Sequence, residues 1–233
     1  MTLVTRRRLR WAPTAALAAL AVTGATLTGV SVATGETATT TSSGAHHQMT
    51  MARADRNQKV ALEKAMRALW EQHMEWTYAT VAAFAAGTPG LTPTLDRLLQ
   101  NQTDIGDAIK PFYGTKAGNA LTTLLRTHIT EAVPVLVAAR SADQAGLQAA
   151  ITAWKANARQ IADFLAAANP HWGRAEMRRM MATHIDQTVA YAAAQLQGRY
   201  SRSIRIYGHA EHHMLEMADV LSRGIIAQFP GRF

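Results

Sequence analysis

The chain contains no cysteine among its 233 residues. Disulfide bridges, thiolate metal sites, a cysteine nucleophile and an N-terminal lipid-modified cysteine are therefore excluded. An oxidising compartment would pose no difficulty to such a chain.

Patterns typical of β-strands are also missing. No segment alternates polar and apolar residues between turn signals, and no repeat of fixed length recurs. Apolar residues instead repeat at helical spacing in stretches separated by glycine or proline. These predicted helices cover residues 53–86, 92–110, 115–141, 147–169, 174–198 and 201–223. We therefore expect an all-α fold, a bundle of about six helices with a four-helix-bundle-like core.

Acidic residues are absent from the first 35 positions, where the arginine-rich run TRRRLR at residues 5–10 precedes a long uncharged stretch. This layout is typical of an export signal, with small residues suited to cleavage near Ala33. The run also resembles the twin-arginine export motif. An uncleaved membrane anchor is the alternative, because the uncharged stretch could span a bilayer although it is weakly apolar. We expect residues 1–33 to be the signal, 34–52 a disordered linker and 53–233 one helical domain of a secreted or envelope-associated protein.

The formal net charge of +8 suggests a nucleic-acid partner only until the leader is removed. The remaining chain has 20 basic and 16 acidic residues, a net charge of +4. The basic residues are spread along the predicted helices, which favours solvated helix faces over a nucleic-acid surface. We expect no nucleic-acid partner, and contact with a membrane only through an uncleaved leader.

Histidines and carboxylates occupy stripes that should face the core. His73 falls on the apolar stripe of the first predicted helix, and His128 and Glu131 fall on that of the third. His184 and Glu211 lie on the stripes of the fifth and sixth. Burying such groups is costly unless they are hydrogen-bonded or coordinated. Imidazoles with carboxylates suit Fe, Mn, Zn or Cu, so we expect these five side chains to bind a transition-metal ion.

Further polar residues are predicted as second-sphere or alternative ligands: Asp104, Asn101, Asn157 and His213. Asn101 and Asp104 lie three apart on one helix edge, where they could reach one ligand or bond a neighbouring helix end. Several methionines flank His184 and His213, which in an exported protein raises copper as one candidate ion. Methionine at helical spacing is nevertheless more often core filler.

Several segments carry a resemblance that spans nearly all of the chain after the leader: LWEQHMEWT, NQTDIG, LLRTHITEA, WKANARQIADFLAAANP and HMLEMADVLSRGIIAQFP. They resemble a family of exported bacterial helical proteins, mostly from actinobacteria and bacilli, to which no established activity is attached. The architecture is similar to ferritin-like or hemerythrin-like bundles. The paired Glu-x-x-His motifs of the first and the His-x-x-x-x-Asp spacing of the second are absent.

The expected function is that of an exported helical bundle with a buried metal site and an unknown reaction. The alternative is a non-enzymatic envelope interaction or scaffold protein whose buried histidines form a structural or pH-sensing network. Some members of the resembled family carry a glycosyltransferase label. The sequence gives that label no support, because it lacks an Asp-x-Asp motif, a glycine-rich phosphate loop and alternating strands and helices.

Overall fold

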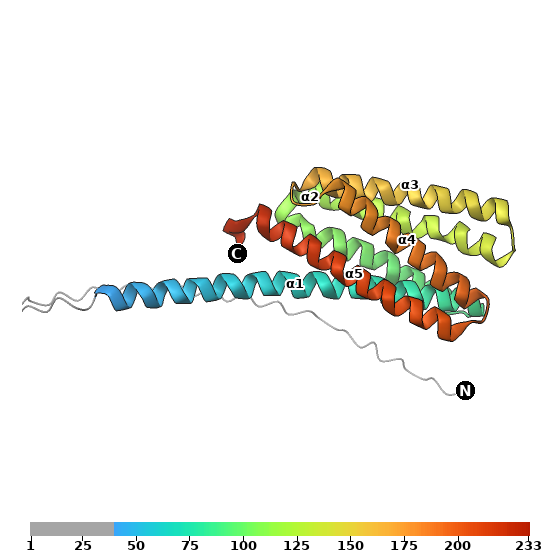
Figure 1. Cartoon of the computed structure of the whole chain (residues 1–233), viewed down its shortest axis with the longest axis horizontal. Helices are drawn as coiled ribbons and strands as arrows, with labels where there is room; N and C mark the ends of the chain where they lie inside the picture. Colours follow the sequence, from blue (N-terminus) through green and yellow to red (C-terminus); the bar gives the residue numbers. More distant parts are fainter. Residues whose placement is uncertain (1–39) are drawn as a thin grey trace, which may run out of the picture. The chain divides into compact units, whose positions relative to one another are not determined.

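The computed structural model describes residues 40–233, with side chains from Met49 onward (Figure 1). The predicted export signal and the first part of the predicted linker lie outside the described residues. The elements are α1 Thr40–Ala86, α2 Leu91–Arg140, α3 Gln144–Ala168, α4 Arg174–Leu196, α5 Tyr200–Gln228 and a short 3-10 helix, Pro230–Arg232. Residues 40–233 contain no strand, which confirms the all-α fold.

The prediction of six helices is wrong, because the described part of the chain forms five α-helices. The second and third predicted helices are joined in α2, whose backbone leaves the helical conformation only at Gly114, with φ 81° and ψ 165°. Glycine tolerates this positive φ, so the chain can turn without ending the element. Arg126, in the part of α2 after Gly114, donates a hydrogen bond to the carbonyl of Leu99, in the part before Gly114, at 2.9 Å. The two halves, residues 91–113 and 115–140, therefore fold back against each other.

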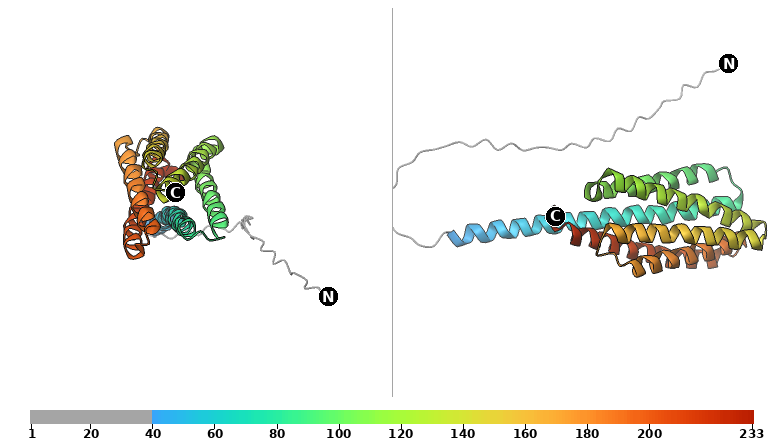
Figure 2. Two further views of the ribbon diagram at one scale, coloured as in Figure 1. Left: turned by 90° about the vertical axis from the view of Figure 1, so that its right-hand side faces the viewer. Right: turned by 90° about the horizontal axis from the view of Figure 1, so that it is seen from above.

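The helices stand around a common centre, which the left view of Figure 2 shows nearly end-on. Residues from Ser43 to Phe233 form one compact unit. Within it α2 packs on α3, α3 on α4 and α4 on α5. α1 is joined to α2 by a hydrogen bond of 3.0 Å from the Asn101 side chain to the Leu69 carbonyl.

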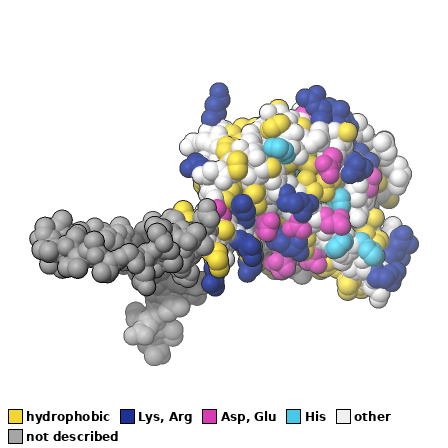
Figure 3. Space-filling view, turned by 60° about the vertical axis from the view of Figure 1, so that its left-hand side comes forward, with side chains coloured by type: hydrophobic (Ala, Val, Ile, Leu, Met, Phe, Trp, Pro, Cys, Tyr) yellow, Lys and Arg dark blue, Asp and Glu magenta, His cyan; other side chains and the backbone are white. Residues whose placement is uncertain are grey.

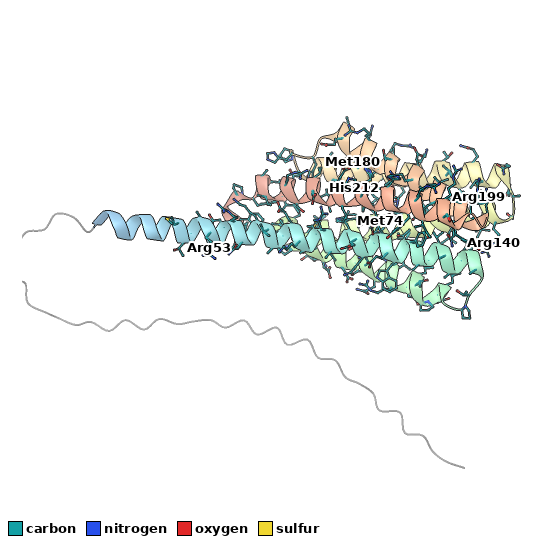
Figure 4. All side chains as sticks on the ribbon, turned by 60° about the horizontal axis from the view of Figure 1, so that its bottom comes forward. Arg53, Met74, Arg140, Met180, Arg199 and His212 are labelled. Carbon is teal, nitrogen blue, oxygen red and sulfur yellow. The ribbon has the colours of Figure 1, made fainter. Side chains whose placement is uncertain are left out.

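α1 begins at Thr40, inside the segment that the sequence predicts as a linker. Its first turns extend past the other helices, in the region where Figure 4 labels Arg53. Side chains there are mostly exposed, including Met49 and Met51. The buried part of α1 starts at Met66, where large apolar side chains begin to face the core.

Local signals explain where the helices end. Gly87 follows α1 with φ 64°, and the amide of Thr88 donates to the carbonyl of Ala83 at 3.1 Å, as in a Schellman motif. Asp143 caps α3, because its Oδ1 accepts a hydrogen bond from the Gly146 amide at 2.9 Å. These signals place the breaks between α1 and α2 and between α2 and α3 near their predicted positions.

The surface of the described residues mixes both signs of charge. Figure 3 shows Lys and Arg side chains interspersed with Asp and Glu over one face. Ion pairs such as Arg178–Asp163, at 2.7 Å, link neighbouring helices. None of the helices between residues 40 and 233 combines the length and apolarity needed to cross a bilayer.

Replacing Gly224 by alanine is expected to lower the free energy of unfolding by about 2 kcal/mol. A Cβ at this position in α5 would collide with Nε1 and Cδ1 of the Trp172 indole, which is buried in the loop between α3 and α4. The rigid indole cannot move without opening the core beside it. Urea denaturation of the wild type and the variant measures the difference. A change below about 0.5 kcal/mol, the usual range at surface sites, would show that Trp172 can move aside.

Candidate metal site

Three histidines meet in the interior of the bundle, each from a different helix. His73 lies on α1, beside the Met74 labelled in Figure 4, His128 on the second half of α2, and His184 on α4. Their exposed fractions are 2%, 3% and 3%, which confirms their predicted burial. The His184 ring centroid lies 5.7 Å from that of His73 and 5.8 Å from that of His128. We call these residues the histidine cluster.

Hydrogen bonds hold the His128 ring in one orientation. Its Nδ1 lies 2.8 Å from Oδ1 of Asn157, while Nδ2 of Asn157 donates to the Leu124 carbonyl at 3.2 Å. Because the amide oxygen can only accept, Nδ1 of His128 carries the proton. Nε2 then carries the free lone pair of the ring, and this atom is buried without a hydrogen-bond partner among the described residues. Nε1 of Trp154 also donates to the His128 backbone carbonyl, at 2.8 Å.

The other two rings are less fully bonded. Nδ1 of His73 lies 3.2 Å from Nε2 of Gln102 on the first half of α2. Gln102 also donates to the carbonyl of Leu98 at 2.8 Å, which orients its amide nitrogen toward the histidine. Nδ1 of His184 is buried and has no partner within the part of the chain that the structure describes. The cluster thus contains two buried ring nitrogens that nothing in the described protein satisfies.

Burial keeps the histidine cluster uncharged. Loss of hydration lowers the pKa of His73 from 6.5 to about 3 and that of His128 to about 4, because an imidazolium is poorly solvated in the core. The pKa of His184 also falls well below 6.5, first through burial and then through repulsion from His73 and His128. All three rings are therefore neutral at pH 7, the form in which imidazole binds metals.

Two cavities border the histidine cluster. The larger, of about 50 Å³, is lined by the three rings, by Thr77 and Thr188, and by apolar side chains that include Leu98. The threonine hydroxyls donate to the carbonyls of His73 and His184, at 2.6 and 2.8 Å, so each hydroxyl is satisfied within its own helix. The smaller cavity, of about 10 Å³, touches the same three rings. A volume near 10–15 Å³ admits about one water-sized body.

Two of the predicted second-sphere residues lie at the cluster. Asn157 bonds His128 directly. Asn101 is fully buried one residue before Gln102, and its Oδ1 lies 3.1 Å from Nε2 of Gln102, whose two hydrogens are shared among Asn101, Leu98 and His73. It thereby helps orient the group that contacts His73.

The predicted carboxylates lie elsewhere. Glu211 accepts a hydrogen bond from the Tyr207 hydroxyl at 3.1 Å. Asp104 contacts Arg97 at 3.3 Å. Glu131 is half-buried, and burial raises its pKa; its Oε2 lacks a partner within the described chain, yet Glu131 lines neither cavity beside the cluster.

His213 borders the histidine cluster without joining it. Its Nε2 lies 3.0 Å from the Met180 carbonyl, and its charge is one cause of the lowered pKa of His184. Figure 4 labels Met180 on α4 and His212 on α5, the residue that precedes His213. A ring nitrogen bonded to a carbonyl is the ordinary state of a satisfied histidine.

Sequence reasoning missed two residues that shape the site, Gln102 and Trp154. Gln102 occupies the stripe of Leu98 and Ile105, so the same rule that found the histidines could have found it. Trp154 gave no signal, because an indole on an apolar stripe is ordinary core.

Residues 40–233 contain no group of three or more histidine and carboxylate side chains placed so that it could hold a metal ion as it stands. Comparisons of the chain with protein-family models, curated proteins and solved structures find no match. The resemblance to exported bacterial helical proteins therefore stays a prediction, and the function has to be argued from the site.

Proposed function

We propose that this protein is an exported helical bundle that holds one transition-metal ion through His73, His128 and His184. The observation that carries the proposal is the pair of buried ring nitrogens, Nε2 of His128 and Nδ1 of His184, that have no partner among residues 40–233. Leaving a buried nitrogen unsatisfied costs about 1–3 kcal/mol. Coordination would remove this cost for both atoms. Export is supported by the arginine-rich leader pattern alone.

The distances between the ring centroids also support binding of a single ion by these histidines. With metal–nitrogen bonds of 2.0–2.1 Å, imidazoles arranged tetrahedrally around one ion have ring centroids about 5 Å apart. The centroids of His73 and His128 lie 5.7 and 5.8 Å from that of His184. For these two pairs, binding to one ion therefore requires the rings to turn and to approach by about half an ångström.

Asn157 would act as the second-sphere partner of the ion. Its Oδ1 accepts a hydrogen bond from the Nδ1–H of His128, which fixes the tautomer and leaves Nε2 as the ligand atom. The carboxylates of Glu211 and Asp104 are not part of this proposal, since their oxygens are engaged with Tyr207 and Arg97.

Metal analysis of the protein purified without a histidine tag tests the proposal. We expect about one equivalent of Co²⁺ or Zn²⁺ to bind the wild type, and at least about tenfold weaker binding in the double variant His128→Gln and His184→Gln. His212→Gln is the matched control, because that side chain is 77% exposed. Equal binding by the wild type and the double variant would remove these residues from the site.

A structural network that senses pH is the second candidate. Gln102 and Asn157 each bond one ring of the cluster, so part of the network is satisfied without any ion. This candidate predicts that no metal binds and that the double variant loses stability. Metal titration combined with thermal denaturation separates the two functions.

A further inference from the structure

The smaller cavity beside the histidine cluster is lined by thioethers as well as imidazoles. Besides Trp70 and Leu125, its wall consists of six side chains with metal-binding atoms: His73, His128, His184, Met181, Met214 and Met217. The three methionines are at most 5% exposed. Nitrogen and sulfur donors thus surround a space of about 10 Å³, the size of about one water molecule.

Helical spacing brings these donors to one place. Met181 and His184 lie three residues apart on α4, and Met214 and Met217 lie three apart on α5. Residues three apart share a helix face, so each helix presents two donors to the same cavity. α4 and α5 pack directly on each other, so these four donors come from two adjacent helices.

We propose that the ion of this site is copper in its monovalent state, Cu⁺, held by the three imidazoles together with methionine sulfur. This inference rests on the proposed function, since it assigns the ion to the same histidine cluster. Thioether sulfur is a soft ligand that selects Cu⁺, whereas Fe²⁺ and Mn²⁺ favour sites with carboxylate oxygen. No carboxylate lines this cavity.

The charge of the ion also favours Cu⁺. All six donors are uncharged, so the positive charge of a bound ion is not neutralised by its ligands. The cost of moving an ion out of water rises with the square of its charge, which makes a divalent ion about four times as costly as a monovalent one. A buried set of neutral imidazoles and thioethers therefore favours Cu⁺ over Zn²⁺ or Fe²⁺.

Anaerobic titration with Cu⁺ against a coloured Cu⁺ chelator tests this assignment. We expect the double variant Met214→Leu and Met217→Leu to weaken Cu⁺ binding by at least about tenfold, while Co²⁺ binding through the histidines stays unchanged. Leucine nearly conserves the volume of methionine, so the fold should persist, and circular dichroism verifies it. Met177→Leu is the matched control, because Met177 is buried on α4 but does not line this cavity.

X-ray absorption of the Cu⁺-loaded wild type provides a test without any variant. In addition to nitrogen, we expect a shell of sulfur atoms at about 2.3 Å from copper, which is the usual metal–sulfur distance. Two results would overturn the copper inference and leave the proposed function standing. One is Co²⁺ binding together with a copper spectrum that shows no sulfur ligand. The other is equal Cu⁺ affinity in the wild type and the double variant. If neither Cu⁺ nor Co²⁺ binds, the proposed function itself is wrong.

Discussion

Lowering the pH from 7.5 to 5 is expected to reduce the free energy of unfolding of the metal-free protein by at least about 4 kcal/mol, the sum for His73 and His128. The histidine cluster is the cause, since burial holds the pKa of His73 at about 3, that of His128 at about 4, and that of His184 well below 6.5. The unfolded chain binds protons at these positions near pH 6.5, whereas the folded chain does not. Stability is therefore complete above pH 6.5 and is lost as the pH falls toward the folded values. His73 and His128 each contribute about 2 kcal/mol of this loss at pH 5, and the lowered pKa of His184 adds a loss in the same direction.

Urea denaturation in the presence of a chelator, repeated between pH 7.5 and 5, measures this loss. Replacing His128 by glutamine should reduce the slope of stability against pH by about 1.4 kcal/mol per pH unit, the contribution of one proton. A wild-type loss below about 1 kcal/mol would mean that the folded protein accommodates charged histidines in its core.

Replacing Gly118 by alanine is expected to lower the free energy of unfolding by about 3 kcal/mol, the upper end of the usual cost of overpacking. The two halves of α2 cross where Gly106 faces Gly118. A Cβ on Gly118 would lie 2.6 Å from the Gly106 carbonyl oxygen, and a Cβ on Gly106 would lie 2.7 Å from that of Gly118. Backbone atoms cannot rotate away as a side chain can, so the halves must separate. His128 lies on the second half of α2, and its position relative to Gln102 would change with them.

Gly208→Ala is the control for this substitution. Gly208 is an exposed residue inside α5, and a Cβ there meets nothing within 4 Å. Alanine should stabilise that helix by up to about 1 kcal/mol, because it favours helix more than glycine does. Equal effects of alanine at positions 118 and 208 would contradict the close crossing in α2.

The burial of the three histidines could be predicted from the sequence of each helix taken alone. His73, His128 and His184 each recur at the spacing of their apolar neighbours, and spacing along one helix fixes which face a side chain occupies. The same rule also selected Glu131 and Glu211, which are only half-buried. Whether a position on the stripe is fully covered depends on how closely the adjacent helix packs over it, and one helix alone does not determine this.

The path of α2 could not be predicted in the same way. Lys110, Pro111 and Gly114 indicated a break between two helices. In the structure the backbone stays helical through Pro111 and leaves the helical conformation only at Gly114, where a positive φ that glycine tolerates lets the chain reverse. The close packing of Gly106 on Gly118 decides that the segments pair with each other.

The sequence by itself determined the all-α class of the described chain, the burial of three histidines, and the exclusion of thiolate chemistry, because these depend only on residue type and helical period. The tertiary structure decided which buried groups meet. It joined His73, His128 and His184 with Met181, Met214 and Met217, and it left Glu211 and Asp104 with other partners. The physical reason is that contacts between helices depend on crossing angle and axial register, which are fixed by the packing of the whole core.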